Sequence, residues 1–343
     1  MKNNNSYSIA NWALFLVWFP AILMGACSTP APAENEEEKV KHDTVYLDTN
    51  KVVKEPTTPP PPPPRETTRA EKYYLITDSA KYIYDLYTYD VKIRLPYVLE
   101  TVSGLTWIGD NHVAMVEDEG GKVYEYDLQK KKITHSVAFS APGDFEGIAW
   151  TGEHYYAVKS NGDLYRLPKT EESRVKPKKT ETPLSSRNNI EGICYDGDKN
   201  RLLIITKQTG DLKKQKVKGK AVFAFNLKKE KFKQKPVLTI NQDKLLEFFT
   251  THRDLVYDPG RVKIKPSGIA IHPLSGHFYV LASTGKIMVE MDRKGEVVAT
   301  YPISPNLLIQ PEGICFAPNG DLYIASEGQG ERGYILKFKV KEK

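Results

Sequence analysis

The sequence has few cysteines: 343 residues contain only Cys27, Cys194 and Cys315. Three cysteines cannot form the set of disulfides that holds small secreted domains together. Cys194 and Cys315 occupy the same place in two copies of a repeated phrase described below, so we expect them to be small buried residues and not a disulfide pair. An apolar core must therefore stabilise the fold, and a chain of this length can bury one.

The N-terminal apolar run is too short to cross a bilayer. It covers Trp12–Met24, which is 13 residues, whereas a membrane-spanning helix needs about 20. The run leads into Leu23-Met24-Gly25-Ala26-Cys27, which resembles the bacterial lipobox. We therefore predict a lipoprotein signal peptide over residues 1–26 and acyl chains such as palmitate on Cys27. The alternative is an ordinary secretory signal with an incidental cysteine.

Motifs that identify an enzyme by themselves are also missing. No serine-hydrolase elbow or zinc-ligand spacing occurs, and the seven histidines are scattered. Asp196–Asn200 begins like a calcium loop, but Lys207 stands where the closing glutamate is required. We expect a hairpin turn at Asp196–Asn200 instead.

Residues 27–71 are rich in proline and glutamate and have no pattern of core residues. An acidic run at 34–38 and six prolines at 59–64 predict a disordered, extended tether. An acidic run soon after a lipidated cysteine also resembles the surface-export signal of Bacteroidetes lipoproteins. We expect a protein anchored by lipid in the cell envelope, favour the outer over the inner membrane, and take exposure at the cell surface as a further hypothesis.

One short phrase recurs five times in the remaining chain. It consists of Ser or Glu, then Gly, then Ile or Leu, and it is followed by a polar turn and an apolar run. Its copies start at Ser103, Glu146, Glu191, Ser267 and Glu312, with intervals of 43, 45, 76 and 45 residues. A period in the low forties with two-residue alternation is typical of β-propeller blades.

We therefore predict an all-β fold, a five-bladed propeller over residues 72–343. The fifth unit stops after its third strand near Val340, and 90–95 has the pattern of the missing outer strand. Pairing between them would close the ring and leave no exposed edge. A six-bladed ring, with Tyr73–Tyr89 as an additional partial unit, is the alternative. The 76-residue interval predicts two insertions, a loop at 208–220 and a short helix within 242–265.

The positive charge is concentrated in one sector. Residues 207–235 contain eleven lysines and two acidic residues. Such a cluster could bind anionic lipid, polysaccharide or nucleic acid, but a solvated surface is the commoner outcome. We favour the solvated surface and expect a monomer that does not bind nucleic acid.

The first residue of each phrase should lie at the mouth of the central channel, because the first strand of a blade is the innermost. Three of these residues are the glutamates Glu146, Glu191 and Glu312. Converging carboxylates raise one another's pKa unless a cation joins them. Two cation sources remain open, namely ion pairs with Lys159 and Lys207, or a calcium ion held by the three glutamates. The other predicted residues around the mouth are Ser103, Asp144, Asn189, Ser267 and Glu327.

Residues 93–340 resemble the SdiA-regulated (YjiK-like) family of bacterial β-propellers, distant relatives of NHL-repeat proteins. The residues that carry the resemblance are Leu95-Pro96, Ser103-Gly104-Leu105, Asp144-Phe145-Glu146-Gly147, Asn189-Ile190-Glu191-Gly192-Ile193 with Lys207, Pro266-Ser267-Gly268-Ile269, and Pro311-Glu312-Gly313-Ile314 with Ser326-Glu327. The resemblance implies a five-bladed propeller, membrane association and a calcium site, without an established activity.

Two functions are compatible with these observations. The first, which we favour, is a binding or scaffolding propeller that holds a protein or small-molecule ligand at the channel mouth. The second is a calcium-dependent esterase or lactonase of the paraoxonase or senescence-marker type. We assign no catalytic residue, because only Asp144, Asn188 and Asn189 lie near the phrase.

Overall fold

The computed structural model describes residues 75–76, 82–252, 255–256 and 263–341. The predicted signal peptide, Cys27 and the predicted tether lie outside the described residues. Among the described helices, none is long and apolar enough to cross a membrane.

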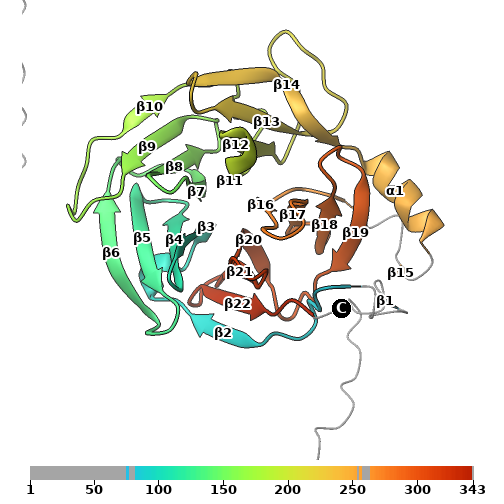
Figure 1. The fold of residues 1–343 in the computed structure, drawn as a ribbon, viewed down its shortest axis with the longest axis horizontal. Coiled ribbons are helices and arrows are strands. Elements are labelled where there is room, and N and C mark those ends of the chain that lie inside the picture. The colour runs from blue at the N-terminus through green and yellow to red at the C-terminus, as the bar shows by residue number, and fades with distance from the viewer. Residues whose placement is uncertain (1–74, 77–81, 253–254, 257–262, 342–343) are drawn as a thin grey trace, which may run out of the picture. The chain divides into compact units, whose positions relative to one another are not determined.

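Five four-stranded antiparallel sheets surround a central channel (Figure 1). Blade 1 consists of β3 (Val102–Gly109), β4 (His112–Glu117), β5 (Lys122–Asp127) and β6 (Lys132–Ala138). Blade 2 consists of β7 (Phe145–Trp150), β8 (His154–Lys159), β9 (Leu164–Pro168) and β10 (Lys178–Thr180). Blade 3 consists of β11 (Ile190–Asp196), β12 (Arg201–Thr206), β13 (Lys220–Asn226) and β14 (Lys231–Ile240). Blade 4 consists of β16 (Gly268–Ile271), β17 (Phe278–Ala282), β18 (Ile287–Met291) and β19 (Val297–Pro302).

Blade 5 closes the ring with strands from both ends of the described chain. It consists of β20 (Gln310–Phe316), β21 (Leu322–Glu327), β22 (Tyr334–Phe338) and β2 (Val91–Arg94). β2 pairs antiparallel with β22, with Ile93 opposite Ile335. The predicted five-bladed ring and its closure by the N-terminal strand are confirmed, and the six-bladed alternative is wrong.

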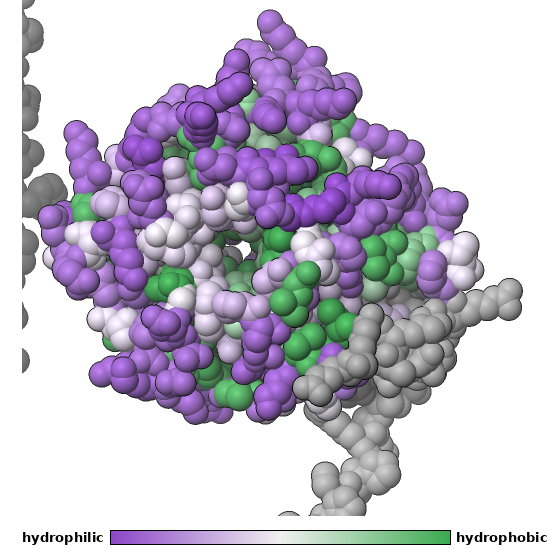
Figure 2. Space-filling model, viewed as in Figure 1, coloured by the Kyte–Doolittle hydropathy of each residue, from purple (hydrophilic) through white to green (hydrophobic). Residues whose placement is uncertain are grey.

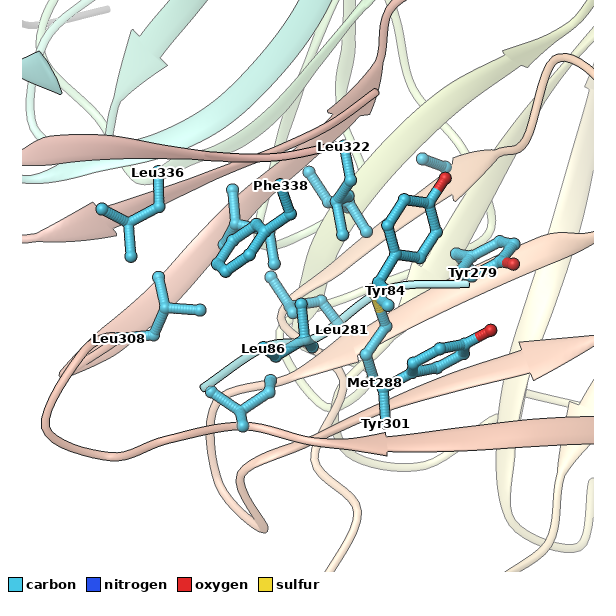
Figure 3. Close-up of a cluster of buried hydrophobic side chains, with 14 of the residues drawn as sticks. Tyr84, Leu86, Tyr279, Leu281, Met288, Tyr301, Leu308, Leu322, Leu336 and Phe338 are labelled. Carbon is cyan, nitrogen blue, oxygen red and sulfur yellow. The ribbon is translucent and has the colours of Figure 1, made fainter. Parts of the chain in front are cut away.

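Residues 82–86 of the segment considered for a sixth blade instead fill the space between blades 4 and 5. Tyr82, Tyr84 and Leu86 are buried there among side chains of both blades, and Figure 3 shows Tyr84 and Leu86 in this cluster. The Tyr84 hydroxyl donates to the carbonyl of Gly320 at 2.5 Å. Burial of these three side chains attaches residues 82–86 to the propeller without adding a blade.

The second insertion of blade 3 carries a helix at the periphery of the ring (Figure 1). The predicted helix is α1 (Gln242–Thr251). Asn241 caps its N-terminus, because the Asn241 side chain accepts a hydrogen bond from the backbone amide of Asp243. Leu245 and Phe249 pack into the core shared by blades 3 and 4. Beyond the helix, β15 (Leu255–Val256) pairs with β1 (Leu75–Ile76).

Two short 3₁₀ turns complete the elements, η3 (Tyr97–Leu99) and η4 (Gly197–Lys199). η4 occupies the segment that begins like a calcium loop. The Asp196 carboxylate before it binds Arg201 at 2.8 Å and Arg293 at 3.0 Å. Asp196 therefore joins blades 3 and 4 by ion pairs, and the segment is a turn, as predicted.

The glycines of the five phrases form the wall of the channel: Gly104, Gly147, Gly192, Gly268 and Gly313. Each lies against the first strand of the next blade, so that no side chain fits between them. A Cβ at Gly104 would lie 2.8 Å from the Cα of Gly147, and one at Gly268 would lie 2.8 Å from the carbonyl oxygen of Glu312. Glycine is therefore required at these positions by the close approach of neighbouring backbones.

Candidate functional site at the channel mouth

The first residue of the phrase lies at a β-bulge in four of the five blades. The pairing between the first and second strands shifts register at Ser103, Glu146, Glu191 and Glu312. A bulge leaves one residue out of the ladder and redirects its side chain. The alternating pattern did not reveal these bulges, although they explain how an innermost strand presents its first residue at the mouth.

The channel is narrow where the phrases meet. Residues from all five blades line it, and the space left between them is about 10 Å³, which is about the room that one water molecule needs. The view down the ring axis shows this narrow central opening (Figure 2). The wall therefore admits at most one water or ion, and any larger ligand must bind at the mouth.

The two serines at the mouth, Ser103 and Ser267, make hydrogen bonds that join neighbouring blades. Ser103 Oγ donates to the carbonyl of Phe145 at 2.5 Å, and Ser267 Oγ donates to the carbonyl of Pro311 at 2.7 Å. Both bonds run to the following blade, and both serines are buried. We therefore assign these predicted mouth residues a structural role in joining neighbouring blades.

The three glutamates differ from the serines, because they gather charge in a poorly solvated place. Burial, followed by the charge of Glu191, raises the pKa of Glu146 to about 10, and a hydrogen bond with Asp144 also raises it. Burial and the charge of Glu191 likewise raise the pKa of Glu312 well above its ordinary value. At neutral pH, Glu146 therefore favours the protonated form, and the pKa of Glu312 is shifted in the same direction.

Glu191 is the glutamate that has a cation as its partner. Lys207 Nζ and Asn189 Nδ2 both donate to Glu191 Oε1, at 2.8 and 2.7 Å. Burial still raises the pKa of Glu191, while Lys207 opposes the shift. Asn189 has a positive φ of 49°, a conformation that asparagine tolerates better than most residues. The predicted pairing of Lys207 with a glutamate is confirmed.

Lys159 is the last residue of β8 in blade 2, one position before the place that Lys207 occupies in blade 3, and it has a different environment. Its ammonium group lies 4.7 Å from the ring centre of Phe145 and 5.7 Å from that of Tyr165. Within the described part of the chain, Lys159 makes no ion pair with a carboxylate. The predicted pairing of Lys159 with a glutamate is therefore wrong, because the aromatic faces beside it attract the ammonium group instead.

Blades 5 and 1 add two more carboxyl groups to the mouth. Burial and the charge of Asp118 raise the pKa of Glu327, a predicted mouth residue, to about 7. Asp118 was not predicted, and its Oδ1 is buried without a hydrogen-bond partner among the described residues. Gln310, also not predicted, hydrogen-bonds to both Glu312 and Glu327. Asp118 could have been found from its place after the second strand of its blade, which matches that of Lys207.

The mouth contains more acidic than basic groups. Its carboxyl groups are those of Asp118, Asp144, Glu146, Glu191, Glu312 and Glu327. Lys207 is the cation that acts on several of them. Asp144 accepts a short hydrogen bond from Ser160 Oγ, and Lys286 donates to the carbonyls of Leu308 and Ile309.

Calcium bound by all three glutamates does not fit this arrangement. Calcium takes six to eight oxygen ligands at short distances. Among the residues that the structure describes, no three Asp, Glu, His or Cys side chains converge closely enough to hold a metal ion. One oxygen of Glu191 is also bound already by Lys207 and Asn189. Glu146, Glu191 and Glu312 therefore form an open set of carboxyl groups at the mouth, called the acidic rim below, and not a closed metal site.

The chain resembles known proteins in sequence family and in fold. The sequence model of the SdiA-regulated family matches residues 83–330. The structure of a glutaminyl cyclase from Myxococcus xanthus is 14% identical, with a TM-score of 0.50, and the match covers 74% of this chain and 97% of that one. A structural genomics protein of unknown function from Bacteroides thetaiotaomicron is 12% identical, with a TM-score of 0.43, over 72% of this chain and 70% of that one. No curated protein matches the sequence. At such identities the likeness to solved structures shows the fold alone.

Proposed function

Because the chain belongs to the SdiA-regulated family of β-propellers, we propose that it is a binding propeller whose acidic channel mouth receives a positively charged group. The observation that carries this proposal is the excess of carboxyl groups around Lys207. Burial and mutual repulsion hold Glu146 and Glu312 in a state that favours a proton. A cation at the same place would attract the ionised carboxylates and compete with the protons for them.

Two kinds of positively charged group are candidates, a calcium ion and a protonated amine. Calcium is the one that the sequence predicts, and it would require the rim glutamates to move closer together. A protonated amine needs only hydrogen-bond acceptors spread around it, which the contact of Lys207 with Glu191 already illustrates. The amine therefore fits the rim as it stands, and calcium is the second arm of the test.

Thermal unfolding of the full-length protein tests the proposal. We compare calcium chloride, magnesium chloride and spermidine with sodium chloride at matched ionic strength. A cation at about 100 times its Kd stabilises by about 2.7 kcal/mol, which raises the Tm by several degrees for a domain of this size.

Two variants identify the site. Glu146→Gln/Glu312→Gln should remove the stabilisation, and Glu171→Gln/Glu172→Gln, which changes two exposed glutamates of blade 2, should retain it. If neither calcium nor spermidine stabilises the protein beyond sodium, or if the first double variant responds as the unchanged protein does, the proposal is wrong.

The esterase or lactonase alternative has less support. Asn188 is buried, and its Nδ2 donates to the carbonyls of Thr209 and Asp211. Asn189 donates a hydrogen bond to Glu191. These side chains hold the structure together and do not form a free polar set beside the glutamates, so we favour binding over catalysis.

The proposal also includes the place of the protein in the cell. The lipobox-like sequence supports a lipid anchor on Cys27 in the envelope, preferably in the outer membrane, with the propeller held away from the membrane by residues 28–71. Incorporation of labelled palmitate that is lost in Cys27→Ser tests the anchor. Protease treatment of intact cells tests surface exposure, and a protein that stays uncut would contradict it.

A further inference from the structure

A second concave site lies on blade 5, and its charge is opposite to that of the mouth. It is a cavity of about 490 Å³ between β2, the residues after it and the loop that joins β21 to β22. This volume lies within the range of small-molecule pockets. Three cations line it, Lys92, Arg94 and Arg332, together with one carboxylate, that of Glu331.

The three cations have no acidic partner among the residues that the structure describes. Within the described part of the chain, none of Lys92, Arg94 and Arg332 makes an ion pair, with Glu331 or any other residue. Elsewhere on the surface some lysines do pair, as Lys178 does with Glu230 and Lys216 does with Asp211. Three unpaired cations around one cavity repel one another, and an anion placed between them would remove this repulsion.

Two of these cations are held in position. Lys92 Nζ lies 4.1 Å from the ring centre of Tyr334. Arg332 Nε donates to the carbonyl of Leu95 at 2.6 Å, and its guanidinium group lies 5.5 Å from the ring centre of Tyr97. A solvated surface does not require such contacts. Side chains fixed in advance lose less entropy when a ligand binds.

The same cavity has an apolar wall. Tyr97 is 69% exposed and Ile309 is 43% exposed, which are high values for large apolar side chains. Both residues line the cavity. A ligand that covers them would bury apolar area in addition to neutralising charge.

The cavity adjoins the channel mouth but is distinct from it. Gln329, which lines the cavity, donates through Nε2 to Gln310 Oε1 at 2.8 Å. Gln310 in turn hydrogen-bonds to Glu312 and Glu327 of the mouth. The blade-5 cavity and the acidic rim are therefore neighbours of opposite charge.

We propose that the blade-5 cavity binds a small organic anion, with its carboxylate or phosphate on Lys92, Arg94 and Arg332 and its ring or apolar part on Tyr97 and Ile309. Arginine binds carboxylate and phosphate through paired hydrogen bonds, which makes Arg94 and Arg332 suitable for either group. This site does not depend on the cation proposed for the mouth.

Calorimetric titration of the full-length protein tests the proposal. The probes are benzoate, glucuronate and glucose 6-phosphate, with glucose and inorganic phosphate as comparisons, at matched ionic strength. We expect at least one of the organic anions to bind with a Kd of about 1 mM or lower. Glucose should not bind, and inorganic phosphate should bind more weakly than that organic anion, because phosphate cannot cover the apolar wall.

Two double variants form a matched pair for this test. Lys92→Gln/Arg94→Gln removes two exposed cations spaced by two residues on the outermost strand of blade 5. Lys231→Gln/Lys233→Gln removes two exposed cations with the same spacing on the outermost strand of blade 3. The first should weaken anion binding about tenfold or more, and the second should leave it unchanged. Tyr97→Ala should weaken the binding of the organic anion more than the binding of phosphate.

Several results would overturn the proposal. The proposal is wrong if none of the three organic anions binds, or if glucose or inorganic phosphate binds as tightly as the organic anions. It is also wrong if the two double variants lose equal amounts of anion affinity. Equal melting curves for the two double variants establish that any difference in binding is not caused by unfolding.

Discussion

The wall and the mouth of the channel are built from adjacent residues of the same phrase, yet they obey different constraints. The wall position is glycine in all five blades, because a Cβ there would collide with the next blade. The mouth position is Glu in three blades and Ser in two. The serines bond to the next blade, whereas the glutamates accumulate charge. Packing thus fixes the wall, and the glutamates of the mouth are not explained by packing.

A similar contrast separates two lysines at neighbouring positions near the ends of the second strands of blades 2 and 3. Lys159 packs on aromatic rings, whereas Lys207 pairs with Glu191. The position after the second strand is Asp118 in blade 1, Ser160 in blade 2 and Lys207 in blade 3, so it has no single structural role that the fold repeats. Differences between blades, more than the repeat itself, indicate where a propeller binds its ligand.

The largest expected effect comes from a substitution at a glycine of the channel wall. Gly104→Ala places a Cβ 2.8 Å from the Cα of Gly147 and 2.9 Å from the backbone nitrogen of Ile148. Because backbone atoms cannot move aside cheaply, we expect a loss of about 2–4 kcal/mol in the free energy of unfolding. Urea unfolding followed by tryptophan fluorescence measures it. Gly197→Ala is the control, because its Cβ would have only ordinary contacts; equal stability of the two variants would contradict the role of the wall.

The next effect concerns the ion pair of the mouth. Lys207→Met leaves Glu191 buried with only Asn189 as a partner, which should cost about 1–3 kcal/mol at pH 7.5. Lys159→Met should cost no more than about 1 kcal/mol, because it removes only contacts with aromatic rings. Urea unfolding of the two variants gives both values. Because the pKa of Glu191 is raised, the cost of Lys207→Met should shrink as the pH is lowered and Glu191 takes up a proton; equal costs for the two lysines would show that their environments do not differ in energy.

The smallest effect is a pH dependence. The folded pKa of Glu327 is about 7, above its ordinary value of 4.5, so the folded state binds the proton more tightly. Its stabilisation is fully present below pH 4.5 and is lost as the pH rises through 7. After allowance for solvent screening of this half-buried group, we expect Glu327→Gln to remove about 1 kcal/mol of the change in unfolding free energy between pH 5 and pH 8.

Urea unfolding at several pH values measures this difference. Glu171→Gln, at an exposed glutamate, should keep the pH dependence of the unchanged protein. A Glu327→Gln variant with the same pH profile as the unchanged protein would show that the mouth is better solvated than its burial indicates.

The sequence alone predicted most of the fold, because each blade repeats one local pattern. The spacing of the Gly-Ile/Leu phrase gave five blades, and the unpaired third strand near Val340 led to β2 as its partner. The three-residue β10 was not predicted, since its segment is rich in Lys, Glu and Pro and lacks alternation. The insertion of Tyr84 and Leu86 between blades 4 and 5 was also missed, because it depends on the shape of a space that only the closed ring creates.

The candidate site was predicted in outline but not in its contacts. The order of residues along a strand identified Glu146, Glu191 and Glu312 as neighbours at the mouth. The bulges that redirect them depend on pairing between strands, and the choice of Lys207 over Lys159 depends on aromatic rings that happen to lie nearby. Such contacts between distant segments are not encoded in a local pattern.

The most direct test of the acidic mouth is to count the protons that a cation displaces. Calorimetric titration of the full-length protein with the cation that stabilises it, in HEPES and in Tris at pH 7.5, separates the heat of binding from the heat of proton release. Because Glu146 favours its proton at this pH, we predict release of about one proton or more for each cation bound. Binding without proton release, or release that persists in Glu146→Gln/Glu312→Gln, would contradict the proposal that these carboxyl groups receive the cation.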